Sequence, residues 1–257
     1  MRAVASVTAL KQATGLEFRI VWQALWDCRA WFDELFEPTD LISIVRPTPF
    51  FKLGIRRNLY IPRLPRLPRL LCGYCERMIK YHIPDEEFRC LAEQHEKLYV
   101  ITCYSHYPYP VETMRSLFRP LPHLQERIGE VTSRFTERSL GVHIRRTDNT
   151  RSIENSPLSA FRAAIDKEID EGRADLIYLA TDSEDVKHYM RSAYGSRVIY
   201  ATSKAERGTL SGMEDAVVEL WTLAQAGRIF GSYWSSFSDT AAELFGRPLH
   251  IIVKNEQ

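Results

Sequence analysis

The sequence has no apolar run of the roughly 18 residues that would be needed to span a bilayer. It also lacks a large excess of charge, since 34 Lys and Arg stand against 33 Asp and Glu, for a formal net charge of +1. A global field that would attract nucleic acid is therefore absent, and we expect no nucleic-acid partner. The cysteines number only five, an odd count without the spacing of a disulfide framework. They indicate reduced thiols and a cytoplasmic location.

The remaining counts are those of an ordinary globular protein. The 257 residues correspond to about 1.7 domains of ~150 residues, which suits two small domains or one large one. Hydrophobic residues make up 45% and charged residues 26% of the chain, so general disorder is excluded.

The second half of the chain has a regular alternation of elements. Strands are expected at 140–144, 175–180, 197–200, 228–232 and 249–253, and helices at 157–171, 183–194, 213–226 and 236–245. Such alternation predicts βαβ units on a parallel sheet. Ligands bind outside the carboxyl ends of the strands in such sheets, which directs attention to the polar segments 145–148, 181–183 and 234–238.

The first half predicts a less regular α/β layer. Helices are expected at 1–14 and 86–97, and strands at 16–22, 41–45 and 98–102. Doubly wound domains usually begin with a strand and a Gly-rich turn that lead into the first helix. Because this sequence begins directly with the predicted helix 1–14, we expect the preceding strand and loop to be missing from it. A helix at 124–136 is expected to link the halves, giving an irregular domain at 1–123 and a Rossmann-like domain at 124–257.

The segment Arg46–Lys80 is strongly basic, with nine Lys and Arg and the single acid Glu76. A Pro-Arg-Leu repeat within it would place Arg63, Arg66 and Arg69 on one edge of a polyproline II helix. This edge suits phosphates, an acidic glycan or an anionic membrane surface, and peripheral membrane contact is one expectation. The alternative is a stiff surface connection with solvated arginines.

The segment 143–148, H-I-R-R-T-D, carries the strongest chemical signal. Two adjacent arginines at a strand end can present planar, permanently charged groups to a phosphate. The alternative is that Arg146 or Asp148 only pairs with a neighbour, because adjacent side chains on an extended chain point in opposite directions.

The same segment resembles the first motif, H-x-R-R-T-D, of the α1,6-fucosyltransferases. These enzymes belong to a wider superfamily together with the nodulation and protein O-fucosyltransferases. The segments 177–182 (I-Y-L-A-T-D) and 231–238 (G-S-Y-W-S-S-F-S) resemble the second and third motifs, and 219–226 resembles the acidic helix before the third. The match covers about residues 140–245. It implies a GT-B-like α/β fold, with two Rossmann-type domains whose parallel sheets face a central cleft.

The resemblance also implies a function, namely inverting transfer of fucose or a related sugar from a GDP-sugar to a glycan hydroxyl, without a metal or other cofactor. Arg145 would hold the β-phosphate of the donor, and Glu219 would accept hydrogen bonds from guanine, with Asp215 one turn earlier as an alternative. Asp182 and Ser236 would line the donor pocket or, in the structural reading, cap helices. The donor-binding set is His143, Arg145, Arg146, Asp182, Asp215, Glu219, Ser235, Ser236, Phe237 and Ser238.

The chain departs from the family pattern where the catalytic base is expected. Asn149 stands where the α1,6 enzymes have a basic residue, and Ile153 stands where they have a glutamate, with Glu154 next to it. Inverting transfer needs a carboxylate to accept the acceptor proton, for which Asp148 and Glu154 are both candidates. The catalytic set is therefore Arg145, Asp148 and Glu154. A non-catalytic protein that binds nucleotides or glycans on a transferase scaffold is the alternative.

Weaker signals have simpler explanations. Cys72 and Cys75 form a lone C-x-x-C without a second pair at zinc spacing. The acidic run at 182–185 lies at a strand-to-helix turn, where capping is the simpler reading than metal binding. Trp22, Trp26 and Trp31 are suited to stacking on sugars, although packing is the default.

Overall fold

The fold was analysed in a computed structural model that describes residues 1–24, 28–47, 70–71, 78–79, 83–201 and 208–254. The chain divides into two compact units, Met1–Arg119 and Pro120–Gln257. The boundary expected between residues 123 and 124 lies within helix α5 (Pro122–Thr132), which belongs wholly to the second unit.

The second unit is built on a five-stranded parallel sheet with the order β7-β6-β5-β8-β9. Its strands are β5 (Ser139–Ile144), β6 (Leu176–Thr181), β7 (Val198–Ile199), β8 (Arg228–Ser232) and β9 (Leu249–Ile252). The chain leads outward from β5 to β7 and then returns to place β8 against the other side of β5. The order therefore reverses between β5 and β8, the place where open α/β sheets bind their ligands.

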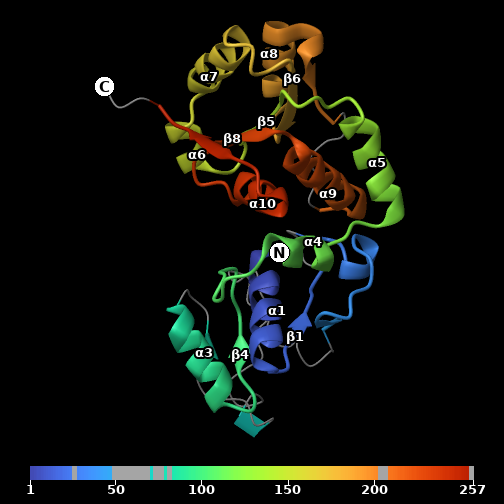
Figure 1. The fold of residues 1–257 in the computed structure, drawn as a ribbon, viewed down its shortest axis with the longest axis vertical. Helices are drawn as coiled ribbons and strands as arrows, with labels where there is room; N and C mark the ends of the chain where they lie inside the picture. Colours follow the sequence, from blue (N-terminus) through green and yellow to red (C-terminus); the bar gives the residue numbers. More distant parts are fainter. Residues whose placement is uncertain (25–27, 48–69, 72–77, 80–82, 202–207, 255–257) are drawn as a thin grey trace. The chain divides into compact units, whose positions relative to one another are not determined.

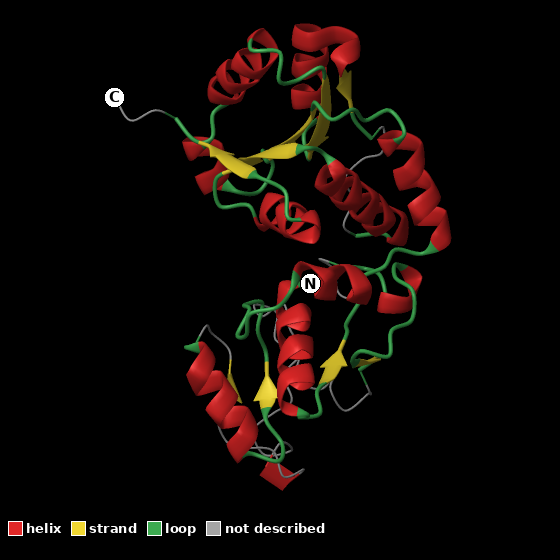
Figure 2. Ribbon diagram, viewed as in Figure 1, coloured by secondary structure: helices red, strands yellow, loops and turns green. Residues whose placement is uncertain are grey.

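Helices cover both faces of this sheet (Figures 1 and 2). The helices α7 (Leu158–Asp170) and α8 (Glu184–Tyr194) lie on one face, and α9 (Leu210–Gln225) and α10 (Ser236–Phe245) on the other. Every residue of β5 is buried, which explains why this strand reads as a continuous apolar run.

The core of the second unit depends on close approach of helix and sheet. Leu140, Val142 and Ile144 of β5 are fully buried in one apolar cluster with Phe161 of α7. On the α9 side, a Cβ at Gly141 would lie only 2.8 Å from Leu223 Cδ1. Glycine at this position therefore lets α9 pack directly on the central strand.

The first unit contains shorter elements around helix α1. Its elements are α1 (Arg2–Thr14), β1 (Arg19–Val21), η1 (Phe32–Glu34), β2 (Ser43–Val45), β3 (Met78–Ile79), α3 (Asp85–Gln94), β4 (Tyr99–Val100) and α4 (Val111–Leu117). Among the described residues, the strands form two separate parallel pairs, β1-β2 and β3-β4. Gly15 ends α1 in the left-handed conformation with φ of 73°, as the glycine in the sequence predicts.

Trp22 contributes to the packing of the first unit. Its ring meets Phe32 at 5.5 Å and Phe118 at 6.4 Å between centroids, and its Nε1 donates to the Ala30 carbonyl at 3.0 Å. Trp22 and Trp31 also line a cavity of about 280 Å³ within this unit. Packing accounts for Trp22, while Trp26 lies outside the described residues.

In the part of the chain that the structure describes, the predicted elements are present with shifted ends, whereas helices α4 and α6 and the short strand β3 were not predicted. Residues 150–155, between the predicted strand 140–144 and the predicted helix 157–171, form α6 (Thr150–Asn155), and residues 111–117 form α4. α6 is only six residues long and begins at the side-chain cap Asn149, whose Oδ1 accepts from the Ser152 amide at 3.1 Å. A helix this short has too few turns to show an apolar period.

Candidate functional site

Three polar segments meet at the carboxyl edge of the five-stranded sheet of the second unit. The pairing of Ile144 with Thr181 makes the chain leave β5 and β6 side by side. Oδ1 of Asp182, directly after β6, accepts a hydrogen bond from the Arg146 amide at 2.8 Å. Ser232, at the end of β8, accepts from the Arg145 amide at 3.1 Å. The segments 145–148 and 181–183 are thus joined by a direct hydrogen bond, and Ser232, just before the segment 234–238, connects the end of β8 to the first of them.

Arg145 lies at the point where the strand order reverses. Its side chain is 15% exposed, and its Nε and Nη2 both donate to Asp148 Oδ1, at 2.8 and 2.5 Å. The Asp148 side chain is 54% exposed. Arg145 is therefore a nearly buried cation with two carboxylate neighbours, the solvent-exposed Asp148 and, at 4.0 Å, the less exposed Asp182. The solvent side of the guanidinium is the side that Asp148 occupies.

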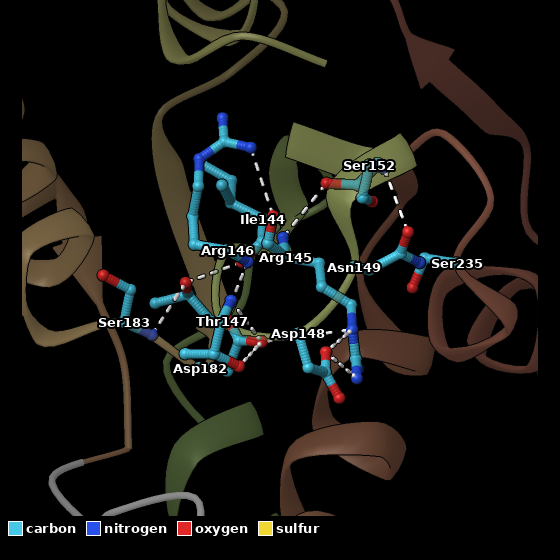
Figure 3. A network of polar contacts seen from close by, with 12 residues as sticks. Ile144, Arg145, Arg146, Thr147, Asp148, Asn149, Ser152, Asp182, Ser183 and Ser235 are labelled. Atoms are coloured by element: carbon cyan, nitrogen blue, oxygen red, sulfur yellow. Dashed lines mark hydrogen bonds and ion pairs between the residues drawn. The ribbon is translucent and has the colours of Figure 1, made fainter. Parts of the chain in front are cut away.

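Arg146 does not share this arrangement. Its guanidinium donates to the main-chain carbonyls of Arg145 and Ser156, at 3.1 and 2.7 Å. Figure 3 shows the two guanidinium groups pointing in opposite directions, as expected for neighbours on an extended chain. The structure thus places Arg145 at the strand edge and gives Arg146 a role in holding the backbone.

Asp182 organises the loop that carries both arginines. Besides the Arg146 amide, it accepts from the amide and hydroxyl of Thr147, at 3.3 and 2.7 Å. Burial alone would raise the pKa of Asp182, but these hydrogen bonds and the charge of Arg145 hold it below its usual value. The cap of α8 is the neighbouring Ser183, whose Oγ accepts from the Val186 amide, so the capping role considered for Asp182 is wrong.

His143 is buried beside the start of α10. Its Nδ1 lies 3.4 Å from Ser235 Oγ, and its ring centroid lies 4.9 Å from that of Phe237. Burial, reinforced by the charge of Arg145, lowers the pKa of His143 to about 4. The imidazole is therefore neutral at physiological pH and offers one donor and one acceptor.

The start of α10 packs tightly against the end of β8. A Cβ at Gly231 would lie 2.5 Å from Ser238 Oγ, so only glycine allows this approach. Ser238 is buried and donates to the Ser235 carbonyl at 3.1 Å. Ser235 occupies the N-cap position without a side-chain cap bond, and Ser236 is the exposed first residue of the helix rather than its cap.

Asn149 connects the segments that follow β5 and β8. Its Nδ2 donates to the Trp234 carbonyl at 2.9 Å, and Ser152 Oγ donates to the Tyr233 carbonyl at 2.7 Å. Trp234 has a φ of 56°, a left-handed conformation that is uncommon for a non-glycine residue. The Asn149 contact helps to hold this strained turn beside the site.

The two acids of α9 that the sequence singled out, Asp215 and Glu219, have different surroundings. Asp215 forms an ion pair with Arg127 of α5. Burial raises the pKa of Glu219 to about 7, and the carboxylates of Asp215, Asp182 and Glu184 add to this effect, while the charge of Lys187 opposes it. Asp215 thus has a structural partner, whereas Glu219 is a half-buried acid that titrates near neutrality.

Glu154, the second candidate for the base, is an exposed residue of α6. The side of α6 that faces the sheet carries Ser152, two residues earlier, which donates to the carbonyl of Tyr233 directly after β8. The structure therefore brings Asp148 to Arg145 and leaves Glu154 at the surface.

Several predicted features fall outside the described residues, namely both cysteines of the C-x-x-C and most of the basic segment 46–80. Within the described ranges, no group of three or more His, Cys, Asp or Glu is arranged to hold a metal ion. No helix in that same part of the chain is long and apolar enough to cross a membrane.

Comparison with solved structures places this architecture in a known group. NodZ alpha-1,6-fucosyltransferase soaked with GDP-fucose matches over 94% of this chain and 86% of its own, with a TM-score of 0.56 and 19% identity. Fucosyltransferase NodZ from Bradyrhizobium matches over 93% and 86%, also with a TM-score of 0.56 and 19% identity. The chain has the fold of the GT-B fucosyltransferases.

POFUT1 in complex with GDP-fucose extends the match to 98% of this chain and 93% of its own, with a TM-score of 0.54 and 12% identity. No family model and no curated protein matches the sequence. At these identities the likeness establishes the fold, and any chemistry must follow from the residues of the site.

Several residues that build this site could not be found from the sequence. Ser156 Oγ accepts from the Tyr233 amide at 2.8 Å and donates to the Ile252 carbonyl at 2.5 Å, and Asn149 was noted only as a departure. Serines that bridge distant loops leave no local signal in a sequence.

Proposed function

We propose that the protein is an inverting glycosyltransferase that moves fucose, or a related sugar, from a GDP-sugar to a glycan hydroxyl without a metal. The observation that carries the proposal is Arg145, 15% exposed at the reversal of strand order, with a solvent-exposed carboxylate as partner. The GDP-fucose complexes of the similar structures support the choice of donor.

Arg145 would bind the β-phosphate of the donor in place of Asp148. As the bond between the anomeric carbon and the β-phosphate oxygen breaks, negative charge develops on the departing GDP. A fixed guanidinium stabilises that charge, and the amide groups at the start of α10 add donors of the same kind. His143 is neutral at physiological pH, so Arg145 rather than His143 would supply the positive charge that stabilises the phosphate.

Asp148 is the better supported candidate for the base. When the phosphate takes its place on Arg145, its carboxylate is released beside the reacting sugar. It can then accept the proton of the acceptor hydroxyl while that oxygen attacks the anomeric carbon from the opposite face. Glu154 has no such relation to Arg145, because it lies at the surface of α6.

The guanine would be bound by Glu219, whose carboxylate matches the two adjacent N–H donors of that base. Asp182 would act indirectly, because its hydrogen bonds to residues 146 and 147 fix the loop that presents Arg145. The acceptor is proposed only as a glycan hydroxyl.

Turnover of GDP-fucose in the presence of a glycan library tests this function. Arg145→Ala should reduce turnover by about a hundredfold or more, the typical effect of removing one group that stabilises transition-state charge. Arg162→Ala is the matched control, because Arg162 lies on the surface of α7 with an exposed side chain. Equal activity of wild type and Arg145→Ala would contradict the assignment.

A further inference from the structure

Trp234, two residues after the end of β8, carries an indole ring at the surface. The residue is 63% exposed, more than any other aromatic residue in the described part of the chain. Burial of an aromatic side chain is one of the larger contributions to folding, so a tryptophan left in water adds little to the stability of the fold. Packing therefore does not account for a tryptophan at this position.

The backbone makes tryptophan an unfavourable residue here. Trp234 has a φ of 56°, and among the described residues it is the only one other than glycine with a positive φ. Glycine adopts this conformation without the steric cost that a side chain brings. The chain thus carries a bulky ring where glycine would be less strained, a pattern that is typical of functional sites.

The turn that carries Trp234 is fixed by side chains from the segment after β5. Asn149 Nδ2 donates to the Trp234 carbonyl at 2.9 Å. The preceding residue is bound at both of its main-chain groups, since the Tyr233 carbonyl accepts from Ser152 Oγ at 2.7 Å and its amide donates to Ser156 Oγ at 2.8 Å. The backbone of Trp234 is therefore held in one position.

Two neighbours orient the ring without covering it. Arg151 Cζ of α6 lies 4.9 Å from the ring centroid, a distance at which a guanidinium and an indole attract each other. The Tyr233 ring lies 6.1 Å away between centroids, at an interplanar angle of 36°. Because Trp234 is 63% exposed with both contacts in place, part of the indole stays open to a ligand.

The exposed ring belongs to the edge of the sheet that carries the proposed base. Asn149, which binds the Trp234 carbonyl, directly follows Asp148 in the chain. Figure 3 shows the Asn149 side chain directed toward Ser235, the residue after Trp234. Trp234 and Asp148 therefore lie on adjoining segments of one site.

A saccharide fits this arrangement. One side of a pyranose ring presents C–H groups, which pack on the face of an indole because the π electrons of the indole attract their partial positive charge. The hydroxyls at the edge of the sugar accept hydrogen bonds, and the Arg151 guanidinium beside the indole offers N–H donors. Guanine could also stack on an indole, and the experiment below separates the two ligands.

We propose that Trp234 binds the acceptor saccharide by stacking on one of its sugar rings. The inference rests on the proposed function, because the acceptor is the second substrate of that reaction. It makes Trp234 a residue that determines which glycans are accepted, while Arg145 and Asp148 act on the donor phosphate and the acceptor proton.

Saturation-transfer NMR of the full chain tests this contact. The probes are the methyl pyranosides of glucose, galactose and N-acetylglucosamine, each in the presence of saturating GDP. At least one of them should receive saturation from wild type on its ring C–H protons. Trp234→Gly should weaken the binding of that saccharide by about tenfold or more, the scale of one aromatic contact with its buried area. The affinity for GDP, measured by calorimetry, should not change.

Two variants separate recognition from folding. Glycine tolerates the φ of 56°, so Trp234→Gly should keep a melting temperature close to that of wild type, and its loss of binding then reports the loss of the ring. Trp234→Phe keeps an aromatic face and should retain most of the affinity for the saccharide.

The remaining outcomes are distinct. Equal saccharide affinity in wild type and Trp234→Gly, or no saccharide binding by a wild type that binds GDP, would overturn the role of Trp234 alone. A parallel loss of GDP affinity in Trp234→Gly would also overturn it, because the ring would then stack on guanine. Failure of wild type to bind GDP would overturn the proposed function and this inference with it.

Discussion

The raised pKa of Glu219 predicts that binding of a GDP-sugar depends on pH. Burial raises this pKa to about 7, and only the ionised carboxylate can accept from both N–H groups of guanine. Binding therefore removes a proton from the fraction of molecules in which Glu219 is protonated. The affinity should rise with pH and level off above the pKa of the free protein.

The size of the effect follows from the ionised fraction. With a pKa of about 7, roughly 3% of the carboxylate is ionised at pH 5.5 and about 90% at pH 8, so the affinity should differ about thirtyfold. This corresponds to about 2 kcal/mol of binding free energy.

The measurement is calorimetry with GDP-fucose from pH 5.5 to 8. The sugar nucleotide is the proper ligand, because its diphosphate is esterified at both ends and has no ionisation near neutrality. Glu219→Gln is the control and should bind weakly with little dependence on pH. The same pH profile in wild type and Glu219→Gln would show that Glu219 is not the group whose ionisation controls binding.

Three more predictions concern neighbouring carboxylates. Glu219→Gln should raise the free energy of unfolding at pH 8, measured with urea, by up to about 3 kcal/mol. The pKa of Glu219 is raised from 4.5 to about 7 in the folded state, so the native carboxylate costs stability as the pH rises through that window. No gain at pH 8, or an equal gain at pH 4, would contradict this. Asp182 has a lowered pKa, so its stabilisation is present above the unfolded pKa and lost as pH falls through the folded value. Asp182→Asn should cost about 1–3 kcal/mol at pH 7 and little at acid pH, and an equal cost at both would argue against the hydrogen bonds as the cause. Asp148→Asn should retain donor binding but reduce turnover by about a hundredfold or more, whereas Glu154→Gln should keep both donor binding and turnover. The reverse pattern would make Glu154 the catalytic base in place of Asp148.

Much of the second unit could be predicted because its signals are local. Buried parallel strands such as β5 are continuous apolar runs, and helices such as α8 begin at capping residues such as Ser183. The rule that parallel strands place their carboxyl ends at one edge then brings residues 145–148, 181–183 and 234–238 together without coordinates.

The individual partners could not be predicted in the same way. Whether Arg146 meets a ligand or a backbone carbonyl depends on the position of Ser156, which follows the missed helix α6. The ion pair of Asp215 with Arg127 depends on packing of α5 against α9, between residues far apart in sequence. Tertiary contacts of this kind decide which polar residues are available to a ligand, and no periodic pattern records them.

We propose above all that the carboxyl edge of the five-stranded sheet binds the nucleotide of a GDP-sugar. Calorimetric titration of the full chain with GDP, UDP, ADP and CMP tests it most directly. We expect binding that is selective for GDP and is lost in both Arg145→Ala and Glu219→Ala. No binding, or equal binding of all four nucleotides, would contradict it and leave a fucosyltransferase fold without a donor site.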